Sequence, residues 1–459
     1  MTGTKVEVAP PPETFDLDCE TLIVGAGAAG LVAALSAREA GQSVLVIEAD
    51  PVPKGSTALS AGLIPAAGTK AQAQAGIEDD AAQFAADIQA KAGNENEQVL
   101  VDCLAGNSAA VIDWLTDTHG LPFSVITNFD YPGHSRRRMH GLPTRSGGEL
   151  IDTLRATCER QDIDIICERR ATRLFHVGAR IAGVEVASPD GGAETIGCRK
   201  LILACNGFGG NRALVGKHLP EIGNGLWFGH DGNRGEAVLW GGALGADLVH
   251  LGSYQGHGNV AHPHGILITW AVITEGGVQV NRDGRRFWNE AQGYSEAARA
   301  VLAQPGAYAF AIFDSRIAGV ARQFEDFKQA EAAGAVKTGA TLEDLATELG
   351  LPVDAFVETI SALPSGGSDR FGRTFGTRGL EAPYCGVRVT GALFHTQGGL
   401  RTGEQARVMR KDGTGFANLY ACGGAACGVS GTSDSGYLSG NGLLSAVVLG
   451  RLAGAAPLA

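Results

Sequence analysis

A glycine turn near the start of the chain constrains its fold more than any other feature. Residues 25–30 read Gly-Ala-Gly-Ala-Ala-Gly, after an apolar run at 21–24 and before an alanine-rich stretch at 31–40. A strand, such a turn and a helix form a dinucleotide-binding unit: the first glycine permits the tight turn, the second lets backbone approach a pyrophosphate, and the third allows close packing. Glu48 ends a second strand, at 43–47, where its carboxylate can accept a hydrogen bond from a ribose hydroxyl.

The C-terminal part of the chain favours FAD over NAD as the dinucleotide. Residues 416–424 indicate a strand that runs into another glycine turn, and Gly440-Asn441-Gly442 precedes an apolar helix at 443–452. The positive N-terminal end of such a helix stabilises negative charge on a reduced flavin ring, which a plain NAD domain does not need.

The residues that we expect to bind FAD lie in or beside glycine-rich and hydroxyl-rich turns and the strands next to them. They are Gly25, Gly27, Ala28, Ala29, Gly30, Glu48, Ala49, Gly55, Ser56, Thr57, Ser60, Ala61, Gly62, Ala171, Cys205, Asn206, Gly207, Gly423, Gly424, Asn441, Gly442 and Leu443.

Composition excludes several classes of partner. A net charge of −12 argues against nucleic acid and anionic membranes, and no run of 18 apolar residues predicts a membrane span. The chain has nine cysteines without a CxxC pair and no signal-peptide pattern, so we expect reduced thiols and a cytoplasmic protein. Cys422 and Cys427 lie near the second glycine turn, where small buried thiols are favoured over a redox pair. The oligomeric state stays open.

Four motifs carry a resemblance to a known family. Residues 276–290, GGVQVNRDGRRFWNE, resemble the cap segment GG-x-x-VN-x-x-G-x-RF-x-NE of the fumarate reductase/succinate dehydrogenase flavoprotein superfamily. Residues 205–209, 395–399 and 438–442 resemble its A-T-G-G-F-G, H-T-M-G-G and L-G-G-N-A turns, in the same order. Relatives with covalently attached flavin carry a histidine in the stretch that corresponds to 54–62, and this chain has none there, which implies non-covalent FAD.

We therefore expect an α/β fold with a Rossmann-like FAD-binding domain of the glutathione-reductase type and an inserted α+β cap domain. The FAD domain is expected at 18–223 and 381–459, after a flexible tail at 1–17. The cap is expected at 224–380, where aromatic and histidine residues cluster and strict βαβ alternation is lost.

Two departures from the fumarate reductase pattern bear on the reaction. Four residues after Asn289-Glu290, where those enzymes carry a proton-delivering arginine, this chain has Tyr294, and Tyr437 replaces an arginine that clamps a carboxylate. The two tyrosines resemble those of the 3-ketosteroid dehydrogenases (Δ1/Δ4). There N-E-x-x-x-Y supplies the base, and in the Δ4 branch a Y-x-S-G motif, matched at 437–440, holds the ketone oxygen.

The resemblance thus implies an FAD-dependent oxidoreductase that acts on CH–CH groups, and the tyrosines favour a ketone desaturase. Tyr294 would abstract a proton and the hydride would pass to flavin N5, while Tyr437, with backbone near Ser439 and Gly440, would hold the carbonyl oxygen. A phenol titrates near 10, so Tyr294 needs a neighbouring cation or hydrogen-bond donor. We expect a small cyclic ketone or keto-acid, or a 3-ketosteroid, as substrate, and an external electron acceptor. The alternatives are a fumarate-reductase-like enzyme acting on an unsaturated acid and a non-catalytic flavin-binding protein.

Other polar residues allow two interpretations. His395 could bind a substrate carboxylate or second carbonyl, or stabilise the fold, and Tyr131 is expected in a turn. The arginines at 136–138 could meet an acidic substrate or lie on a solvated face. The cap histidines His257, His262 and His264 lack companion carboxylates at ligand spacing, so no metal is expected.

Overall fold

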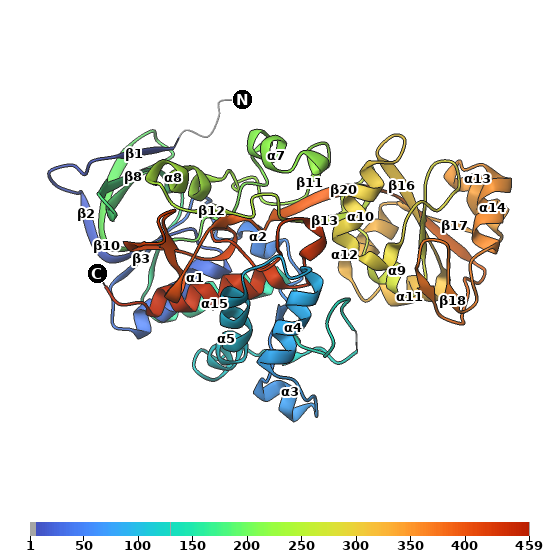
Figure 1. Ribbon diagram of the computed structural model, residues 1–459, viewed down its shortest axis with the longest axis horizontal. Coiled ribbons are helices and arrows are strands. Elements are labelled where there is room, and N and C mark those ends of the chain that lie inside the picture. Colours follow the sequence, from blue (N-terminus) through green and yellow to red (C-terminus); the bar gives the residue numbers. More distant parts are fainter. Residues whose placement is uncertain (1–5, 129, 459) are drawn as a thin grey trace. The chain divides into compact units, whose positions relative to one another are not determined.

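The computed structural model describes residues 6–128 and 130–458, which form two compact units (Figure 1). The first unit contains the described residues up to His218, residues 229–254, and the chain from His395 onward. The second contains residues 219–228 and 255–394. Residues 229–254, which the sequence pattern assigns to the insertion, therefore belong to the first unit, and residues 381–394 belong to the second.

A largely parallel sheet organises the first unit. Its parallel neighbours, in spatial order, are β7 (Asp164–Ile166), β3 (Val44–Ile47), β2 (Leu17–Val24), β10 (Ala193–Leu203) and β23 (Gly415–Ala421). The first half of β10 also pairs with an antiparallel ribbon of β9 (Arg180–Ala187) and β8 (Arg170–Val177), and β22 (Arg407–Met409) pairs with β23. Leu22, Ile23 and Leu201 are fully buried, as expected for strands covered on both faces.

The N-terminal segment differs from the flexible tail expected at 1–17. Residues 1–5 lie outside the described residues, whereas β1 (Glu7–Ala9) pairs in parallel with β8. The Glu7 carboxylate also pairs with the Arg173 guanidinium, so backbone hydrogen bonds and an ion pair order this short segment.

Two helices pack against each other with their backbones nearly in contact. Helix α1 (Ala28–Glu39) and helix α15 (Asn441–Ala455) are rich in small buried residues. A Cβ atom at Gly450 would lie 2.6 Å from the Ala29 carbonyl oxygen, and one at Gly454 would also collide with α1. This close approach therefore depends on glycine at both positions of α15.

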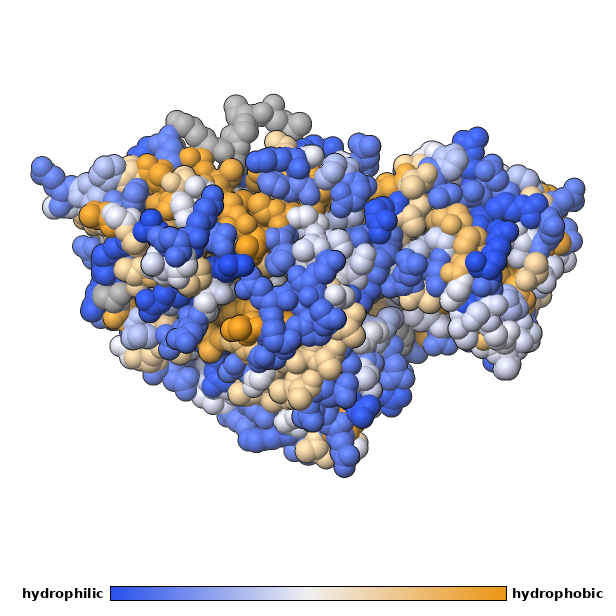
Figure 2. Space-filling view, viewed as in Figure 1, coloured by the Kyte–Doolittle hydropathy of each residue, from blue (hydrophilic) through white to orange (hydrophobic). Residues whose placement is uncertain are grey.

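The remaining elements of the first unit cover the sheet and the turns beside it. Its further helices are α2 (Gly55–Ala58), α3 (Lys70–Gln74), α4 (Ala81–Lys91), α5 (Gln98–Asp117), α6 (Gly147–Arg160), α7 (Arg212–His218) and α8 (Glu236–Leu244). Its small sheets join β4 (Ile64–Pro65), β6 (Met139–Gly141) and β5 (Ser124–Val125), and β12 (Leu248–Val249) with β21 (Gly399–Leu400). Figure 2 shows a mainly hydrophilic face on which apolar residues gather near α8.

Helix α5 is long and apolar enough to cross a membrane by length and composition alone. It packs against α4 and α15, and seven of its apolar residues, including Leu104 and Leu115, are buried in the same core as the sheet. Its hydropathy is therefore accounted for by packing inside the first unit.

The second unit is an α+β structure built on β20 (Tyr384–Thr396), the long strand that ends at the first unit. Its sheet contains β14 (Ile266–Leu267), β13 (Tyr254–Ala261), β20, β16 (Tyr308–Asp314) and β15 (Val278–Val280), with β11 (Leu226–Trp227) and β17 (Val336–Gly339) on β20. Its other elements are α9 (Ala271–Thr274), α10 (Tyr294–Leu302), α11 (Ser315–Ala321), α12 (Glu325–Ala332), α13 (Leu342–Leu349), α14 (Val353–Ser361), β18 (Gly367–Ser368) and β19 (Thr374–Phe375).

Candidate active site

The turns expected to bind the cofactor meet at one edge of the parallel sheet. Strands β2, β3, β10 and β23 end at Val24, Ile47, Leu203 and Ala421, and backbone hydrogen bonds join the turns that follow them. In open α/β sheets, ligands bind outside the carboxyl ends of the strands. This edge is therefore the candidate cofactor groove of the first unit.

The glycine turn has the geometry that a close approach of backbone to a ligand requires. Gly25 has φ +106°, and a Cβ atom there would lie 2.6 Å from the Ala204 carbonyl oxygen. A Cβ atom at Gly30 would collide with the Gly25 carbonyl, so helix and turn can touch only through glycine. At Gly27 the nearest atom to such a Cβ would be the Thr57 hydroxyl oxygen, 3.6 Å away, which leaves room in front of the backbone.

Glu48 joins the second strand to this turn. One oxygen of its carboxylate accepts a hydrogen bond from the Ala26 amide at 2.7 Å, and the other accepts from the Asp50 amide at 3.0 Å. A carboxylate has about four lone-pair positions, so Glu48 keeps the capacity to accept from a ribose hydroxyl.

Ser56 connects the second hydroxyl-rich stretch to two asparagines. Its hydroxyl oxygen accepts hydrogen bonds from the Asn206 amide group at 2.9 Å and from the Asn233 amide group at 2.8 Å. Asn206 has φ +62° and follows β10, while Gly424 packs against Asn206 and Gly207. Asn233 was not expected from sequence.

The other expected cofactor residues surround the same turns. Thr57 accepts a hydrogen bond from the Ala28 amide at 3.1 Å, and the Ser60 carbonyl accepts from the Gly147 amide at 2.9 Å. The remaining positions lie beside them or on neighbouring elements: Ala49 after β3, Gly55 in α2, Ala61 and Gly62 in the turn before β4, Ala171 in β8, Cys205 after β10, Gly423 after β23, and Leu443 in the first turn of α15.

Buried polar atoms test whether these residues fit FAD. Among the described residues, both amide atoms of the Asn441 side chain are buried and lack a hydrogen-bond partner, at the N-terminal end of α15. At the start of α8, one carboxylate oxygen of Glu236 is also buried without a hydrogen-bond partner in the described part of the chain. The other oxygen pairs with the Arg170 guanidinium at 3.1 Å. Burial raises the pKa of Glu236. Unsatisfied polar atoms of this kind are costly, and hydrogen-bonding groups of FAD could satisfy them, so the residues at this edge of the sheet are compatible with the cofactor.

Sequence reasoning did not single out Glu236 as a candidate cofactor residue. Gly235 has φ +86° and precedes it at the N-cap of α8, so a Gly-Glu pair that opens an apolar helix was the available signal.

Next to α15, three residues meet so closely that a side chain at position 442 would press on its neighbours. The rings of His395 and Tyr437 lie edge to face at 5.3 Å. A Cβ atom at Gly442 would lie 3.2 Å from His395 Nε2 and 3.7 Å from the Tyr437 hydroxyl oxygen. Burial raises the pKa of Tyr437 to about 12, although the backbone amides of Gly442 and Gly440 act in the opposite direction. The phenol is therefore a neutral donor beside backbone N–H groups.

Hydrogen bonds indicate which nitrogen of His395 carries the proton. The Ser430 hydroxyl donates to the Gln397 side-chain oxygen at 2.8 Å, so the Gln397 amide nitrogen is free to donate to His395 Nδ1 at 2.9 Å. Burial lowers the pKa of His395 to about 4, so the ring is neutral near pH 7. Nδ1 also lies 3.5 Å from the Thr396 carbonyl oxygen, but the 2.9 Å bond from Gln397 is much shorter, so we assign the proton to Nε2. His395 thus presents an N–H donor on the side of Gly442 and Tyr437.

Tyr294 lies in the second unit, within a stack of rings. It is the first residue of α10, and its ring stacks on His257 with centroids 5.0 Å apart. His257 stacks in turn on Phe394 at 5.3 Å, and Phe394 stacks on Phe228 at 4.7 Å. Trp270 contacts both Tyr294 and His257 edge-on.

His257 is a second buried, neutral histidine, which its sequence context related only to metal binding. Its Nδ1 accepts a hydrogen bond from the Asn259 amide at 3.1 Å, which leaves the proton on Nε2. Burial lowers its pKa to about 3. Among the described residues, no cluster of three or more metal-ligating side chains occurs.

In the 276–290 motif, the arginine of the Arg-Phe pair and the glutamate of the Asn-Glu pair form a buried ion cluster, and the asparagine caps a helix. The Glu290 carboxylate is fully buried between the Arg286 and Arg373 guanidinium groups, and Arg286 also pairs with Asp369. Asn289 caps the short helix that follows by accepting from the Ala291 amide at 3.0 Å. These contacts fix the segment that leads to Tyr294.

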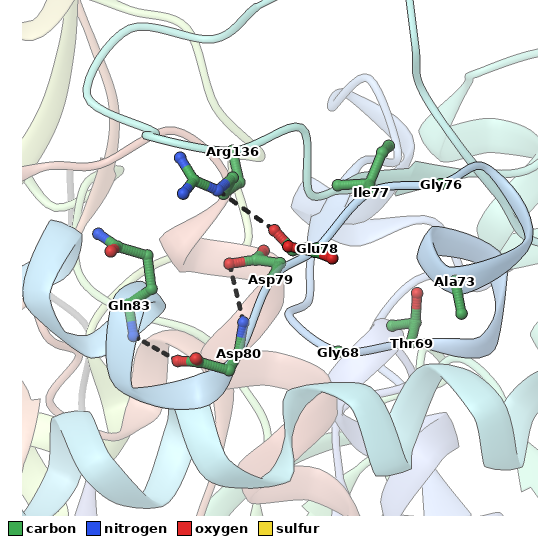
Figure 3. A pocket seen from close by; sticks show the side chains of 10 residues that line it. All are labelled: Gly68, Thr69, Ala73, Gly76, Ile77, Glu78, Asp79, Asp80, Gln83 and Arg136. Carbon is green, nitrogen blue, oxygen red and sulfur yellow. Dashed lines mark hydrogen bonds between the residues drawn. The ribbon is translucent and has the colours of Figure 1, made fainter.

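The arginine run fits neither of its two sequence interpretations as a whole. Arg138 is buried and binds Asp79 and Asp87, whereas Arg137 is exposed and pairs with Asp130. Arg136 borders a polar hollow of about 630 Å³, where it hydrogen-bonds the Glu78 carbonyl (Figure 3). Among the described residues, no expected catalytic or cofactor residue lines this hollow.

The two cysteines near the second glycine turn are buried free thiols. Burial raises the pKa of Cys422 and that of Cys427 to about 12, so both stay protonated near pH 7. This state favours a packing role over a redox pair.

Comparison with known proteins places the chain in a family. Residues 20–443 match the family model described as FAD binding domain. The chain is 32% identical to the probable fumarate reductase Ifc3 of Shewanella frigidimarina over 98% of its own length and 76% of that protein. It is 23% identical to the 4-oxocyclohexanecarboxylate 2-dehydrogenase of Sinomonas cyclohexanicum, over 94% of this chain and 90% of that one.

Solved structures agree with this assignment. The open conformation of a flavocytochrome c3 fumarate reductase matches with a TM-score of 0.82 and 30% identity, over 96% of this chain and 78% of that one. The 3-ketosteroid-Δ4-(5α)-dehydrogenase of Rhodococcus jostii shares the fold, with a TM-score of 0.76 and 23% identity, over 98% of this chain and 99% of that one. The chain therefore belongs to the FAD binding domain family, within the fumarate reductase/succinate dehydrogenase flavoprotein superfamily, and is an FAD-dependent oxidoreductase acting on CH–CH groups.

Proposed function

We propose that this protein is an α,β-dehydrogenase of a ketone, with a small cyclic ketone or keto-acid as its substrate. The observation that carries this proposal is the set of donors around Gly442: the Tyr437 phenol, the His395 Nε2–H and the backbone amides at the start of α15. All are neutral hydrogen-bond donors. Such donors suit a ketone oxygen, on which negative charge grows as the neighbouring C–H bond loses its proton.

Tyr294 is proposed as the base that removes the substrate proton. Removal of two hydrogens from adjacent carbons requires a base for the proton and an acceptor for the hydride, and bound FAD supplies the hydride acceptor. Tyr294 stands at the N-terminal end of α10, where the helix dipole favours an anion, and its ring is held by His257 and Trp270. As the base, the Tyr294 phenolate takes the proton from the carbon next to the carbonyl.

His395 also suits a substrate with a second oxygen function. Its pKa is lowered by burial to about 4 and its Nδ1 accepts from Gln397, so it offers a neutral N–H to an oxygen acceptor. A carboxylate or a second carbonyl of the substrate can accept that hydrogen bond. The relative named 4-oxocyclohexanecarboxylate 2-dehydrogenase supports a cyclic keto-acid over a steroid.

The second candidate is a reductase of an unsaturated acid, in which Tyr294 would donate a proton. The 32% identity to a probable fumarate reductase favours it. Against it stands the replacement of two arginines by Tyr294 and Tyr437, because arginine binds a carboxylate in a bidentate manner that a phenol cannot reproduce.

Anaerobic half-reactions separate the two candidates. Oxidised protein is mixed with 4-oxocyclohexanecarboxylate, cyclohexanone and a 3-ketosteroid, and dithionite-reduced protein is mixed with fumarate and acrylate. Bleaching of the flavin by a saturated ketone supports the dehydrogenase. Reoxidation by the unsaturated acids without any ketone response supports the reductase. A flavin that responds to no compound supports a binding protein without turnover.

FAD is proposed to be held without a covalent bond, because residues 54–62 contain no histidine. Acid precipitation should then release the yellow colour into the supernatant. Colour that remains in the pellet would contradict this proposal. An electron acceptor outside this chain is proposed to regenerate the oxidised cofactor.

A further inference from the structure

The loop that carries Tyr437 is attached to a half-buried histidine outside the proposed site. His134 Nε2 hydrogen-bonds the Ser439 carbonyl oxygen at 2.9 Å. The turn around His134 also packs directly on this loop, since a Cβ atom at Gly133 would lie 2.7 Å from a methyl carbon of Leu438. The His134 ring itself lies against Phe84 of α4, with ring centroids 6.1 Å apart.

A buried ion cluster lies beside His134. The Arg138 guanidinium is buried, pairs with Asp79 through two hydrogen bonds of 2.9 Å, and also binds Asp87. The same guanidinium lies 3.5 Å from His134 Nδ1. A carbonyl oxygen only accepts hydrogen bonds, so the 2.9 Å contact with Ser439 requires a proton on His134 Nε2, while Nδ1 faces the guanidinium, which only donates. His134 therefore donates to the Ser439 carbonyl and cannot accept there.

The geometry of the peptide carries this bond to Tyr437. In a trans peptide the carbonyl of one residue and the N–H of the next point in opposite directions. The His134 bond to the Ser439 carbonyl consequently turns the Gly440 N–H away from His134. The Gly440 amide is one of the two backbone groups that act on the Tyr437 phenol oxygen, and Gly440 has φ +86° at the N-cap of α15.

We propose that His134 is a positioning residue, which holds the Ser439–Gly440 peptide so that the Gly440 N–H faces the Tyr437 phenol oxygen. The Arg138–Asp79–Asp87 cluster is the buried group on the Nδ1 side of the His134 ring. This inference deepens the proposed function, on which its relevance to a ketone substrate rests. His134, Ser439–Gly440 and Tyr437 all belong to the first unit.

The test follows the ionisation of Tyr437 without any substrate. Site-specific 3-fluorotyrosine at position 437 is titrated by ¹⁹F NMR in the FAD-loaded protein, in which His395 is the ring that faces the phenol. His134→Phe keeps a ring against Phe84 but loses the donor, and His134→Gln keeps a donor at the same reach. Arg137→Gln, in an exposed pair of the same segment, is the matched control. FAD content and melting temperature report that each variant is folded.

Loss of the donor frees the peptide to rotate, so the phenolate loses one N–H partner. We expect the ¹⁹F titration midpoint to rise by about one pH unit in His134→Phe, to return at least halfway in His134→Gln, and to stay unchanged in Arg137→Gln. His134→Asn, whose amide is too short to reach Ser439, should match His134→Phe and replaces it if that variant does not fold. An unchanged midpoint in a folded His134→Phe or His134→Asn overturns the proposal. A raised midpoint in a protein that no ketone reduces would leave the positioning role standing and remove the ketone function.

Discussion

The two units contribute tyrosines to the proposed chemistry in contrasting surroundings. In the first unit, Tyr437 is surrounded by hydrogen-bond donors: the His395 Nε2–H and backbone amides at the start of α15. In the second unit, Tyr294 belongs to a row of stacked rings with His257, Phe394 and Phe228. The first setting stabilises charge on an oxygen atom, and the second fixes the position of a ring. This contrast indicates that two residues of one type can hold different roles, one at the carbonyl and one at the proton.

The strongest test of this contrast is Tyr294→Phe, which removes the phenol oxygen and leaves the stack intact. We expect the rate of flavin reduction by ketone to fall roughly 10²- to 10⁴-fold, the usual contribution of a positioned base, with unchanged FAD content and melting temperature. Anaerobic stopped-flow measurement of the flavin absorbance checks this. Tyr308→Phe is the control: Tyr308 lies in the same unit, edge to face with Phe310, and the variant should reduce its flavin at the wild-type rate. A Tyr294→Phe protein that reacts at nearly the wild-type rate would leave Tyr294 as packing alone.

Tyr437→Phe probes the other half of the contrast. The carbonyl would keep the His395 and backbone donors, so the rate of flavin reduction should fall less, on the order of 10²-fold. Stopped-flow traces across pH distinguish the two variants: loss of the base alters the pH profile, whereas loss of an oxygen donor lowers the rate at every pH. If the two variants showed the same profile, the division of roles would be wrong.

Gln397→Leu addresses the orientation of His395. Without the Gln397 donor, Nδ1 can take the proton, and the Nε2–H offered to substrate is no longer guaranteed. We expect the dissociation constant of a keto-acid to rise roughly 2- to 10-fold, the worth of one neutral hydrogen bond, with a smaller effect on the rate of reduction. Equilibrium titration of the flavin spectrum measures it. Gln329→Leu, on an exposed position of α12, should change nothing.

The smallest effect is expected from pH. His395 and His257 have pKa values of about 4 and 3, both lowered by burial, so both rings stay neutral above pH 5. The dissociation constant of a neutral ketone should therefore change less than twofold between pH 5 and 8, where an ordinary histidine with a pKa near 6.5 would gain its proton. Binding that strengthens or weakens sharply near pH 6.5 would contradict the neutral-donor description of the site.

The fold could be predicted from sequence because its signals are local. The turn at 25–30, the strand before it and Glu48 occupy one short stretch. At Gly25 and Gly30 a larger residue would collide with neighbouring backbone atoms. The two-unit organisation followed from a change in residue pattern, although the pattern could not show that residues 229–254 pack with the first unit. That assignment depends on contacts between distant segments, such as β12 with β21.

The candidate site could be predicted only where a motif names the residue. Tyr294, Tyr437 and His395 were predicted from their motif positions. Glu236 and His257 were missed as site residues, because a buried carboxylate oxygen or a ring stack is a property of tertiary packing. The arginine run could not be interpreted from sequence for the same reason. Arg138 is buried against Asp79 and Asp87, which lie 59 and 51 positions away, and no local sequence pattern connects it with them.

The contact between α1 and α15 has a consequence for how this sequence can vary. Both helices begin at the proposed cofactor groove, and their backbones touch where Gly450 meets Ala29. Most buried positions tolerate a change of residue if neighbours compensate in volume, but no neighbouring side chain can shrink to make room for a Cβ atom that meets a carbonyl oxygen. Gly450 and Gly454 should therefore be among the least mutable positions in a library of variants, although neither is expected to touch FAD. Selection for variants that retain FAD would then keep these two glycines unchanged, although they lie far along α15 from the end of the helix at which the cofactor is proposed to bind.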